Sequence, residues 1–198
     1  MDRDERQTRT VGSCIRTRAD TGEELVIEGY FAVFNQETEL LPGAYERIAP
    51  EAFEKTLDRD VRALWNHDTS MVLGRNKAGT LKLRTDSHGL YGEIRINPKD
   101  TEAMNLYERV KRGDVDQCSF GFCINQEETE YREDGSVMWT IRGVDLYEVS
   151  VCTFPAYEDT GVSARCAEYA DIRKRKLEAR KKKLKERLKH GVKTTDAE

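Results

Sequence analysis

Apolar residues recur along this chain at two spacings, one typical of strands and one typical of helices. Runs of β-branched and aromatic side chains end at polar or proline positions, and this pattern predicts β-strands. Two pairs of runs are joined by short polar turns that contain glycine, which predicts hairpins. The expected strands are residues 24–35, 61–68, 117–125 and 146–154, and the expected hairpins are residues 79–97 and 128–141.

Two short helices are expected between these strands. Residues 49–60 begin with Pro50 near a first-turn position, and residues 97–114 stop at Gly113; both carry apolar side chains at helical spacing. The chain shows no repeated strand–helix–strand units of the kind that build parallel sheets. The sequence therefore predicts an α+β fold dominated by antiparallel sheet, as a closed or nearly closed β-barrel.

The distribution of charge changes this picture at the C-terminal end. The 198 residues carry a net charge of −4, but residues 171–190 hold eleven Lys or Arg against three acids, a net +8 that leaves −12 elsewhere. We therefore expect a flexible N-terminal segment at 1–23, a folded domain at 24–167 and a charged tail at 168–198, helical or disordered. Such a tail binds an acidic protein or nucleic acid, or is only solvated.

Several classes of protein are disfavoured. No apolar run approaches the ~18 residues of a membrane span, and the first residues lack the apolar core of a secretory signal, so an intracellular protein without membrane contact is expected. No cysteine sits in a CxxC pair, which predicts buried small residues and neither disulfides nor a zinc site nor another cofactor. The cysteines are Cys14, Cys118, Cys123, Cys152 and Cys166.

Histidine is the usual general base in hydrolysis by a serine, which also needs a nucleophile and a group that orients the base. The chain has three histidines. His88 falls in a predicted turn and His190 in the tail, which leaves His67 at the end of a strand, on the same face as Trp65. The alternative is that His67 only fills space at the strand end.

Ser119 stands in the run D-Q-C-S-F-G-F. In an extended strand Cys118 and Phe120 point to the core, whereas Ser119 and Gly121 lie on a face that carries only small side chains. Another backbone could approach the Ser119 hydroxyl closely on such a face. A helix packed tightly on the sheet would produce the same pattern, and the G-x-S-x-G elbow is absent from the sequence.

Two acids in the run D-L-Y-E-V-S-V could complete a catalytic triad. Glu148 shares a strand face with Ser150 and Cys152, and its burial would be costly without a cationic or N–H partner such as His67. Asp145 precedes it at the strand start and has the character of a turn or rim acid. Glu148 is therefore the preferred third member, with Asp145 as the alternative.

The runs W-N-H-D, K-R-G-D-V-D-Q-C-S-F-G-F and D-L-Y-E-V-S-V follow one another in this order. Together they resemble the caudovirus prohead maturation protease family, whose fold is similar to that of the herpesvirus assemblins. The resemblance spans residues 24–165. It implies that His67 is the general base, Ser119 the nucleophile and Glu148 the third member, although herpesvirus relatives use a second histidine in that place.

The same resemblance implies a fold and a setting. The expected fold is a mostly antiparallel barrel wrapped by a few helices, and the expected enzyme acts inside the viral procapsid in the host cytoplasm. Its substrates would be scaffold segments of the major capsid protein, or a scaffold protein, and then its own chain. An oxyanion hole is expected from backbone N–H groups of residues 157–165, with Arg165 ordering that loop.

Alternatives remain at this point. The chain could be a non-catalytic capsid-assembly or scaffold-binding module that acts through its basic tail, with salt-dependent binding. A thiol nucleophile, Cys118 or Cys123, would not stand in register with Ser119. Cleavage-site specificity and a homo-oligomeric state are left open by the sequence.

Overall fold

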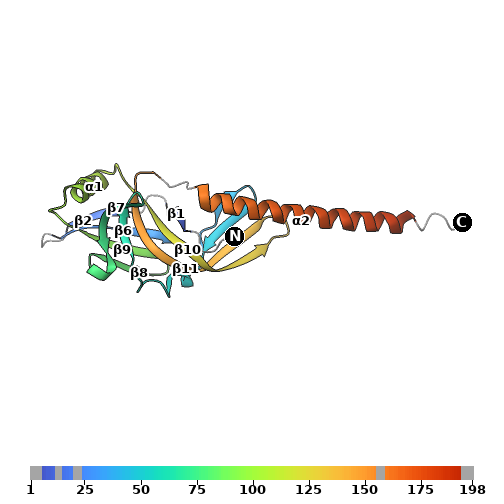
Figure 1. Cartoon of the computed structure of the whole chain (residues 1–198), viewed down its shortest axis with the longest axis horizontal. Coiled ribbons are helices and arrows are strands. Elements are labelled where there is room, and N and C mark those ends of the chain that lie inside the picture. The colour runs from blue at the N-terminus through green and yellow to red at the C-terminus, as the bar shows by residue number, and fades with distance from the viewer. Residues whose placement is uncertain (1–5, 12–14, 20–23, 155–158, 193–198) are drawn as a thin grey trace. The chain divides into compact units, whose positions relative to one another are not determined.

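The computed structural model describes residues 6–11, 15–19, 24–154 and 159–192, with side chains for residues 6–9, 15–19, 24–154 and 169–187. The chain divides into two units, Asp2–Gly161 and a unit that contains Val162–Glu198. The described strands belong to the first unit, and most of the long C-terminal helix belongs to the second (Figure 1).

Two sheets make up the first unit. The larger sheet contains β1 Gln7–Val11, β4 Thr38–Leu41, β5 Ala44–Ile48, β6 Arg62–Trp65, β7 Asp68–Arg75, β10 Gln117–Tyr131 and β11 Val137–Cys152. Its order is β1-β10-β11-β5-β4, and β6 also pairs with β11 and with β7. The smaller sheet has the order β2-β3-β9-β8, formed by β2 Ile15–Ala19, β3 Leu25–Val33, β8 Leu81–Thr85 and β9 Gly89–Ile96.

The α+β character is confirmed, but the predicted closed or nearly closed barrel is wrong. Hydrogen bonds join the strands in two separate sheets, and the partners found for the edge strands β1, β7 and β8 are β10, β6 and β9. Alternation along a strand indicates which face is buried, not which strands become neighbours. The number and order of strands therefore left closure undetermined, and a barrel was the wrong choice.

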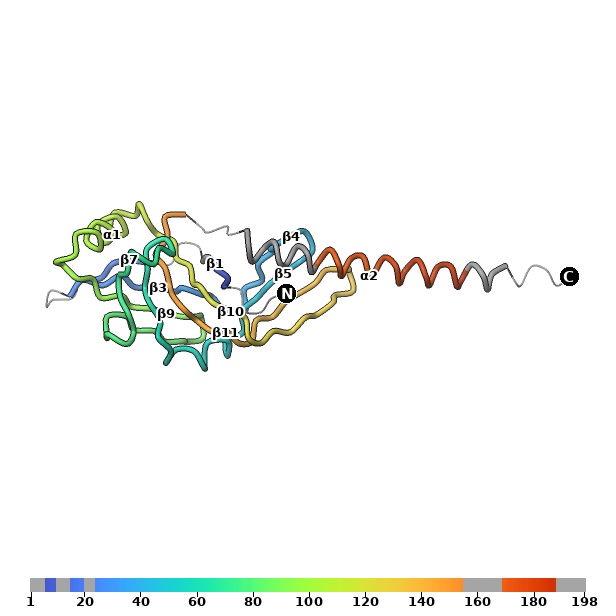
Figure 2. Tube along the Cα trace, viewed as in Figure 1, coloured from blue at the N-terminus to red at the C-terminus, as the bar shows by residue number. Residues whose placement is uncertain are grey.

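β10 and β11 dominate the larger sheet. They run side by side in opposite directions from the pair Gln117 and Cys152 to the pair Tyr131 and Val137 (Figure 2). The predicted shorter strands are thus parts of two long ones, interrupted by bulges instead of loops. β11 also pairs in parallel with β5 and with β6, so it organises the whole sheet.

One apolar cluster contains residues of both sheets. Cys118 and Phe120 point into it as alternation predicted, and so do Phe122 and Ile124. The rings of Phe120 and Phe122 stack with centroids 4.7 Å apart. With one face of β10 committed to this cluster, Ser119 must lie on the other.

The predicted helix at 97–114 is present as α1, Thr101–Arg112, between Asp100 as N-cap and Gly113 as C-cap. The helix predicted at 49–60 is wrong beyond its start, because only a 3-10 turn, Pro50–Phe53, forms.

The rest of that segment is held by tertiary contacts. The Asn76 side-chain amide donates to the carbonyls of Leu57 and Arg59, and the buried Thr56 hydroxyl accepts a hydrogen bond from the Leu146 N–H at 2.7 Å. Local turns also hold it, because the Thr56 and Arg59 N–H groups donate to the carbonyls of Phe53 and Thr56. The Thr56 hydroxyl fixes β11 two residues before Glu148.

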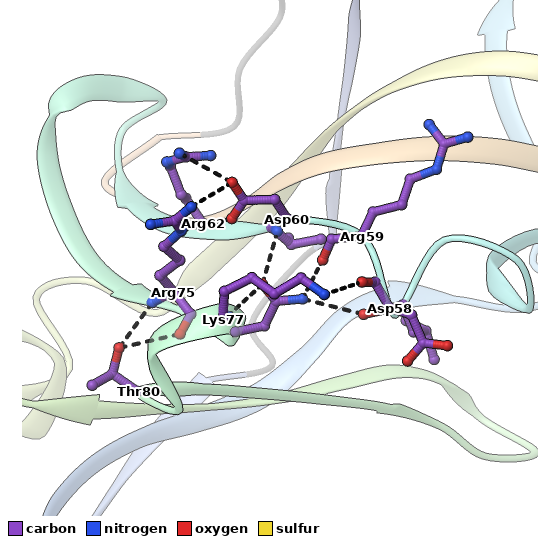
Figure 3. A network of polar contacts seen from close by, with 10 residues as sticks. Asp58, Arg59, Asp60, Arg62, Arg75, Lys77 and Thr80 are labelled. Carbon is purple, nitrogen blue, oxygen red and sulfur yellow. Dashed lines mark hydrogen bonds and ion pairs between the residues drawn. The ribbon is translucent and has the colours of Figure 1, made fainter.

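A polar network closes the open end of the β6–β7 hairpin (Figure 3). The Asp60 carboxylate accepts two hydrogen bonds from Arg75, each 2.7 Å, and lies 3.3 Å from Arg62. Lys77 donates to the Asp58 carbonyl at 2.7 Å. Exposed ion pairs contribute little stability, but a bidentate pair restricts geometry. The network thus orients the hairpin whose other end carries His67.

Two of the strands that the sequence did not predict, β1 and β2, lie within the segment 1–23 for which flexibility was expected. Both are rich in Thr and Arg and carry little apolar signal. β1 pairs with β10 and β2 pairs with β3, so long-range pairing places them in the sheets, not local propensity.

α2, Asp159–Val192, contains the described part of the predicted tail 168–198 and begins nine residues earlier, within the segment 24–167 that was assigned to the folded domain. Its described side chains are mostly exposed, including Leu177 and Leu184. No described helix combines the length and apolar character needed to cross a membrane. Binding of an acidic partner by the tail stays a prediction.

Candidate active site

His67 lies on a tight turn, not on the predicted strand. β6 ends at Trp65, and Asn66 and His67 have φ angles of 52° and 60°, so both adopt the left-handed conformation of a two-residue hairpin turn. Asn and His enter this region more often than most residues other than glycine, but the conformation still costs free energy and persists where surrounding contacts enforce it. The face expected for His67 was therefore wrong, because alternation ends where the turn begins.

Asn66 ties this turn to the end of β11. Its N–H donates to the Val151 carbonyl at 2.9 Å, and its side-chain oxygen accepts from the Thr153 N–H at 2.9 Å. Its side-chain amide also donates to the Thr153 hydroxyl at 3.3 Å. The asparagine in W-N-H-D thus positions the neighbouring histidine against β11.

The His67 ring meets Glu148. Nδ1 of His67 lies 2.7 Å from Oε1 of Glu148, and the Ser150 hydroxyl donates to Oε2 of the same carboxylate at 2.6 Å. The Ser150 oxygen in turn accepts the His67 backbone N–H at 3.2 Å. With Glu148 as a carboxylate, which only accepts, the fitting tautomer of His67 donates from Nδ1 and carries its lone pair on Nε2.

Burial makes these partners necessary. Glu148 is 1% exposed, and the His67 side chain is 14% exposed. An isolated carboxylate in such a place would cost several kcal/mol. His67, Ser150 and the more distant Arg6, whose Nη2 lies 3.7 Å from Oε1, offset that cost.

Gly121 makes room for the carboxylate. It is the cross-strand partner of Glu148, and a Cβ added at Gly121 would lie 2.2 Å from Oε1 of Glu148. Any larger residue would push the carboxylate away from His67. The glycine of S-F-G-F therefore has a steric reason, which the sequence alone did not reveal.

Ser119 lies on the same sheet face as Glu148. Its cross-strand partner is Ser150, and residues directly opposite each other in an antiparallel pair point to the same side. Ser119 is 0% exposed, and its hydroxyl donates to the Arg9 carbonyl of β1 at 2.9 Å. Within the described residues no hydrogen bond joins Ser119 to His67. The structure thus joins two of the three predicted residues and places the third on the same sheet face, with its hydroxyl bonded to the neighbouring strand β1.

Asp145 does not take part in this arrangement. Its Oδ1 lies 3.0 Å from Nη2 of Arg59 and accepts from the Asn125 side chain at 3.1 Å. Asp68, next to His67 in the chain, accepts from the Ser70 N–H and hydroxyl. The acid that contacts His67 is therefore Glu148, and Asp145 is a rim acid as its position indicated.

Cys152 is the thiol beside His67. Its Sγ lies 3.8 Å from Nε2, and Cys152 is 1% exposed. Burial, and after it the charge of Glu148, raises the pKa of Cys152 to about 12. A nucleophilic cysteine needs a lowered pKa, so this thiol is poorly suited to attack.

Cys118 and Cys123, the two alternative thiol nucleophiles, are also buried. Cys118 lies on the core face, where its Sγ is 2.8 Å from the Tyr30 carbonyl oxygen. The buried state predicted for cysteines is thus confirmed for Cys118, Cys123 and Cys152. Cys14 and the Cys166 side chain lie outside the described residues.

For the predicted oxyanion-hole segment, residues 157–165, the structure describes only the backbone of residues 159–165. Residues 157 and 158 lie outside the described chain, and so do the side chains of residues 159–165, that of Arg165 included. The assignment stays a prediction.

Comparison with known families shows to which family the chain belongs. Residues 13–175 match the caudovirus prohead serine protease family. The chain belongs to this family. The resemblance of the three motifs, read in order, is thereby confirmed.

Two individual proteins are similar to this prohead protease family member. The prohead protease of Enterobacteria phage HK97 is 30% identical over 148 residues, which cover 72% of this chain and 61% of that relative. The match thus spans less than two thirds of the relative. The structure of the bacteriophage T4 capsid assembly protease aligns with 13% identity and a TM-score of 0.47, covering 76% of this chain and 98% of that one.

The steric role of Gly121 predicts a coupling with Glu148. We expect Gly121→Ala to lower the free energy of unfolding by about 1–3 kcal/mol, because the new methyl group collides with the carboxylate. In a Glu148→Ala background the same change should cost much less, since the colliding atoms are gone. Urea denaturation of the four proteins measures both costs, and equal costs in the two backgrounds would contradict the assignment.

The raised pKa of Cys152 predicts low reactivity. With a pKa of about 12, roughly one Cys152 thiol in ten thousand is ionised at pH 8, so iodoacetamide should leave Cys152 unmodified in the folded chain. Peptide mass mapping after timed alkylation measures this, with urea-unfolded protein as the control. Labelling of folded Cys152 at the unfolded rate would favour a thiol nucleophile.

Proposed function

We propose that this member of the prohead serine protease family is an active serine endopeptidase with Ser119 as nucleophile, His67 as general base and Glu148 as the orienting acid. One observation carries the proposal: Nδ1 of His67 lies 2.7 Å from the buried Glu148 carboxylate. Glu148 belongs to the strand paired with that of Ser119. The family match supports a serine peptidase, and the motifs that carry the three residues lie within the matched range, residues 13–175.

The proposed chemistry uses Nε2 of His67, the ring nitrogen that does not contact Glu148 and that lies 3.8 Å from Cys152 Sγ. Nε2 takes the proton of the Ser119 hydroxyl while Oγ forms a bond to the scissile carbonyl carbon, and Glu148 stabilises the resulting imidazolium. His67 then donates this proton to the leaving amine nitrogen as the C–N bond breaks, which leaves an acyl-enzyme. Water then gives one proton to Nε2 as its oxygen bonds to the acyl carbon. The bond from that carbon to Oγ breaks, Oγ takes the proton back from Nε2, and the carboxylic acid product leaves with Ser119 restored.

Ser119 must rearrange before this can begin. A hydroxyl has one hydrogen, and that of Ser119 is now directed at the Arg9 carbonyl. Attack requires that hydrogen bond to be exchanged for one to Nε2 of His67.

The family supports a substrate class. Its name refers to the prohead of tailed phages, so we propose that the substrates are scaffold segments of the major capsid protein, or a scaffold protein, and the enzyme's own chain. The proposed place of action is the inside of the procapsid in the host cytoplasm. The match to the HK97 relative covers 61% of that protein, so these assignments are extended from part of its length.

Co-expression with the major capsid protein of the same phage tests this proposal. Wild type should shorten the capsid protein, whereas Ser119→Ala and His67→Ala should abolish cleavage and Glu148→Gln should slow it by about 10²–10⁴-fold. Asp145→Asn is the matched control, because Asp145 contacts Arg59 instead of His67, and it should cleave like wild type. Intact-mass measurement of both chains gives the result.

Two outcomes would overturn the proposal. Cleavage by Ser119→Ala would assign the nucleophile elsewhere. A folded wild type that binds the capsid protein and leaves both chains intact would favour the non-catalytic assembly module.

A further inference from the structure

β1 and the residue before it reach two of the three proposed catalytic side chains. The Arg9 carbonyl accepts the hydrogen bond of the Ser119 hydroxyl, and Nη2 of Arg6 lies 3.7 Å from Glu148. Neither contact joins Glu148 to His67. The N-terminal strand β1 and Arg6 therefore contact the proposed catalytic site directly.

β1 fills the edge of β10 that faces away from β11. It pairs antiparallel with residues 118–122, and Thr10 stands opposite Ser119. A sheet edge presents free N–H and C=O groups, and extended peptides bind by adding a strand to such an edge. β1 therefore occupies the place where an added strand would meet the proposed nucleophile.

A buried ion pair anchors β1 in this place. Arg9 donates to both carboxylate oxygens of Glu46 on β5, at 2.5 and 2.9 Å, and also to the Gln7 side chain at 3.0 Å. Glu46 is 4% exposed and the Arg9 side chain 14%. Removing one partner of a buried pair leaves a charge that is costly to bury. The pairing of the five-residue strand β1 with β10 therefore depends strongly on Arg9.

We propose that the edge of β10 at residues 118–122 is the surface that binds an extended peptide substrate, and that β1 occupies it as a competing segment of the same chain. This inference rests on the proposed peptidase function. While β1 is seated, Ser119 is inaccessible and its single hydroxyl hydrogen is held by Arg9. Displacement of β1 opens the edge, frees this hydrogen and removes Arg6 from Glu148.

A thiol placed at position 119 reports on this displacement without any need for catalysis. In the full-length chain, Ser119→Cys should react slowly with iodoacetamide, and adding Arg9→Ala should raise the rate at position 119 at least tenfold. Peptide mass mapping measures the rate. Cys118, which faces the core and is 0% exposed, is an internal reference that should not change.

Arg84→Ala is the matched control for Arg9→Ala. It also removes an arginine from an ion pair, with Asp86, but on an exposed site of the smaller sheet. It should leave the rate at position 119 unchanged. An equal rate at position 119 with and without Arg9, or an equal acceleration at Cys118, would overturn the proposal.

A peptide tests the binding surface itself. A synthetic peptide with the sequence of residues 6–11, R-Q-T-R-T-V, added at millimolar concentration, should slow alkylation in the Ser119→Cys, Arg9→Ala chain several-fold, and a scrambled peptide should not. If the peptide does not slow alkylation at position 119, the proposed binding surface is wrong. If the labelling results are as expected but the wild type does not cleave the capsid protein, only the proposed peptidase function is contradicted.

Discussion

A carboxylate buried in the larger sheet is the constraint on which the site depends. Glu148 is almost completely removed from water, and an unpaired charge there would cost a sizeable part of the stability of a domain this size. The fold meets this cost with the His67 ring and the Ser150 hydroxyl. It also keeps residue 121 free of a side chain, so that the carboxylate can remain where those partners reach it.

β11 connects these requirements. It carries Glu148 and Ser150, pairs with the strand of Ser119 on one side and with β6 on the other, and receives Asn66 at its end. The strained turn at His67 is therefore enforced by contacts on both sides. A histidine held in this way keeps its Nδ1 on the acid and offers Nε2, which is what a general base for a serine requires.

Much of this site could be predicted from the sequence, because strand alternation is a local property. It assigned Cys118 and Phe120 to the core, Ser119 and Gly121 to the opposite face, and Glu148 to the side of Ser150 and Cys152. The order of the motifs identified the family. Glu148 was preferred over Asp145 because only its burial demanded a partner, and the contact with His67 follows that reasoning.

What could not be predicted depends on contacts between distant segments. The Asn66-His67 turn lacks the glycine that usually announces a two-residue hairpin, so His67 was placed on a strand face. β1 has little apolar character and is held by Arg9 and Glu46, thirty-seven residues apart. The barrel was predicted because closure depends on which strands pair, and the pattern of a single strand contains no such information.

The central claim is that Ser119 becomes a nucleophile through His67. The most direct measurement is reaction of the Arg9→Ala chain, in which β1 is expected to be displaced from Ser119, with a fluorophosphonate, followed by peptide mapping of the adduct. The account predicts one phosphonyl group on Ser119, and none when His67 is replaced by Ala. An adduct on another residue, or one on Ser119 that forms equally well without His67, would contradict it.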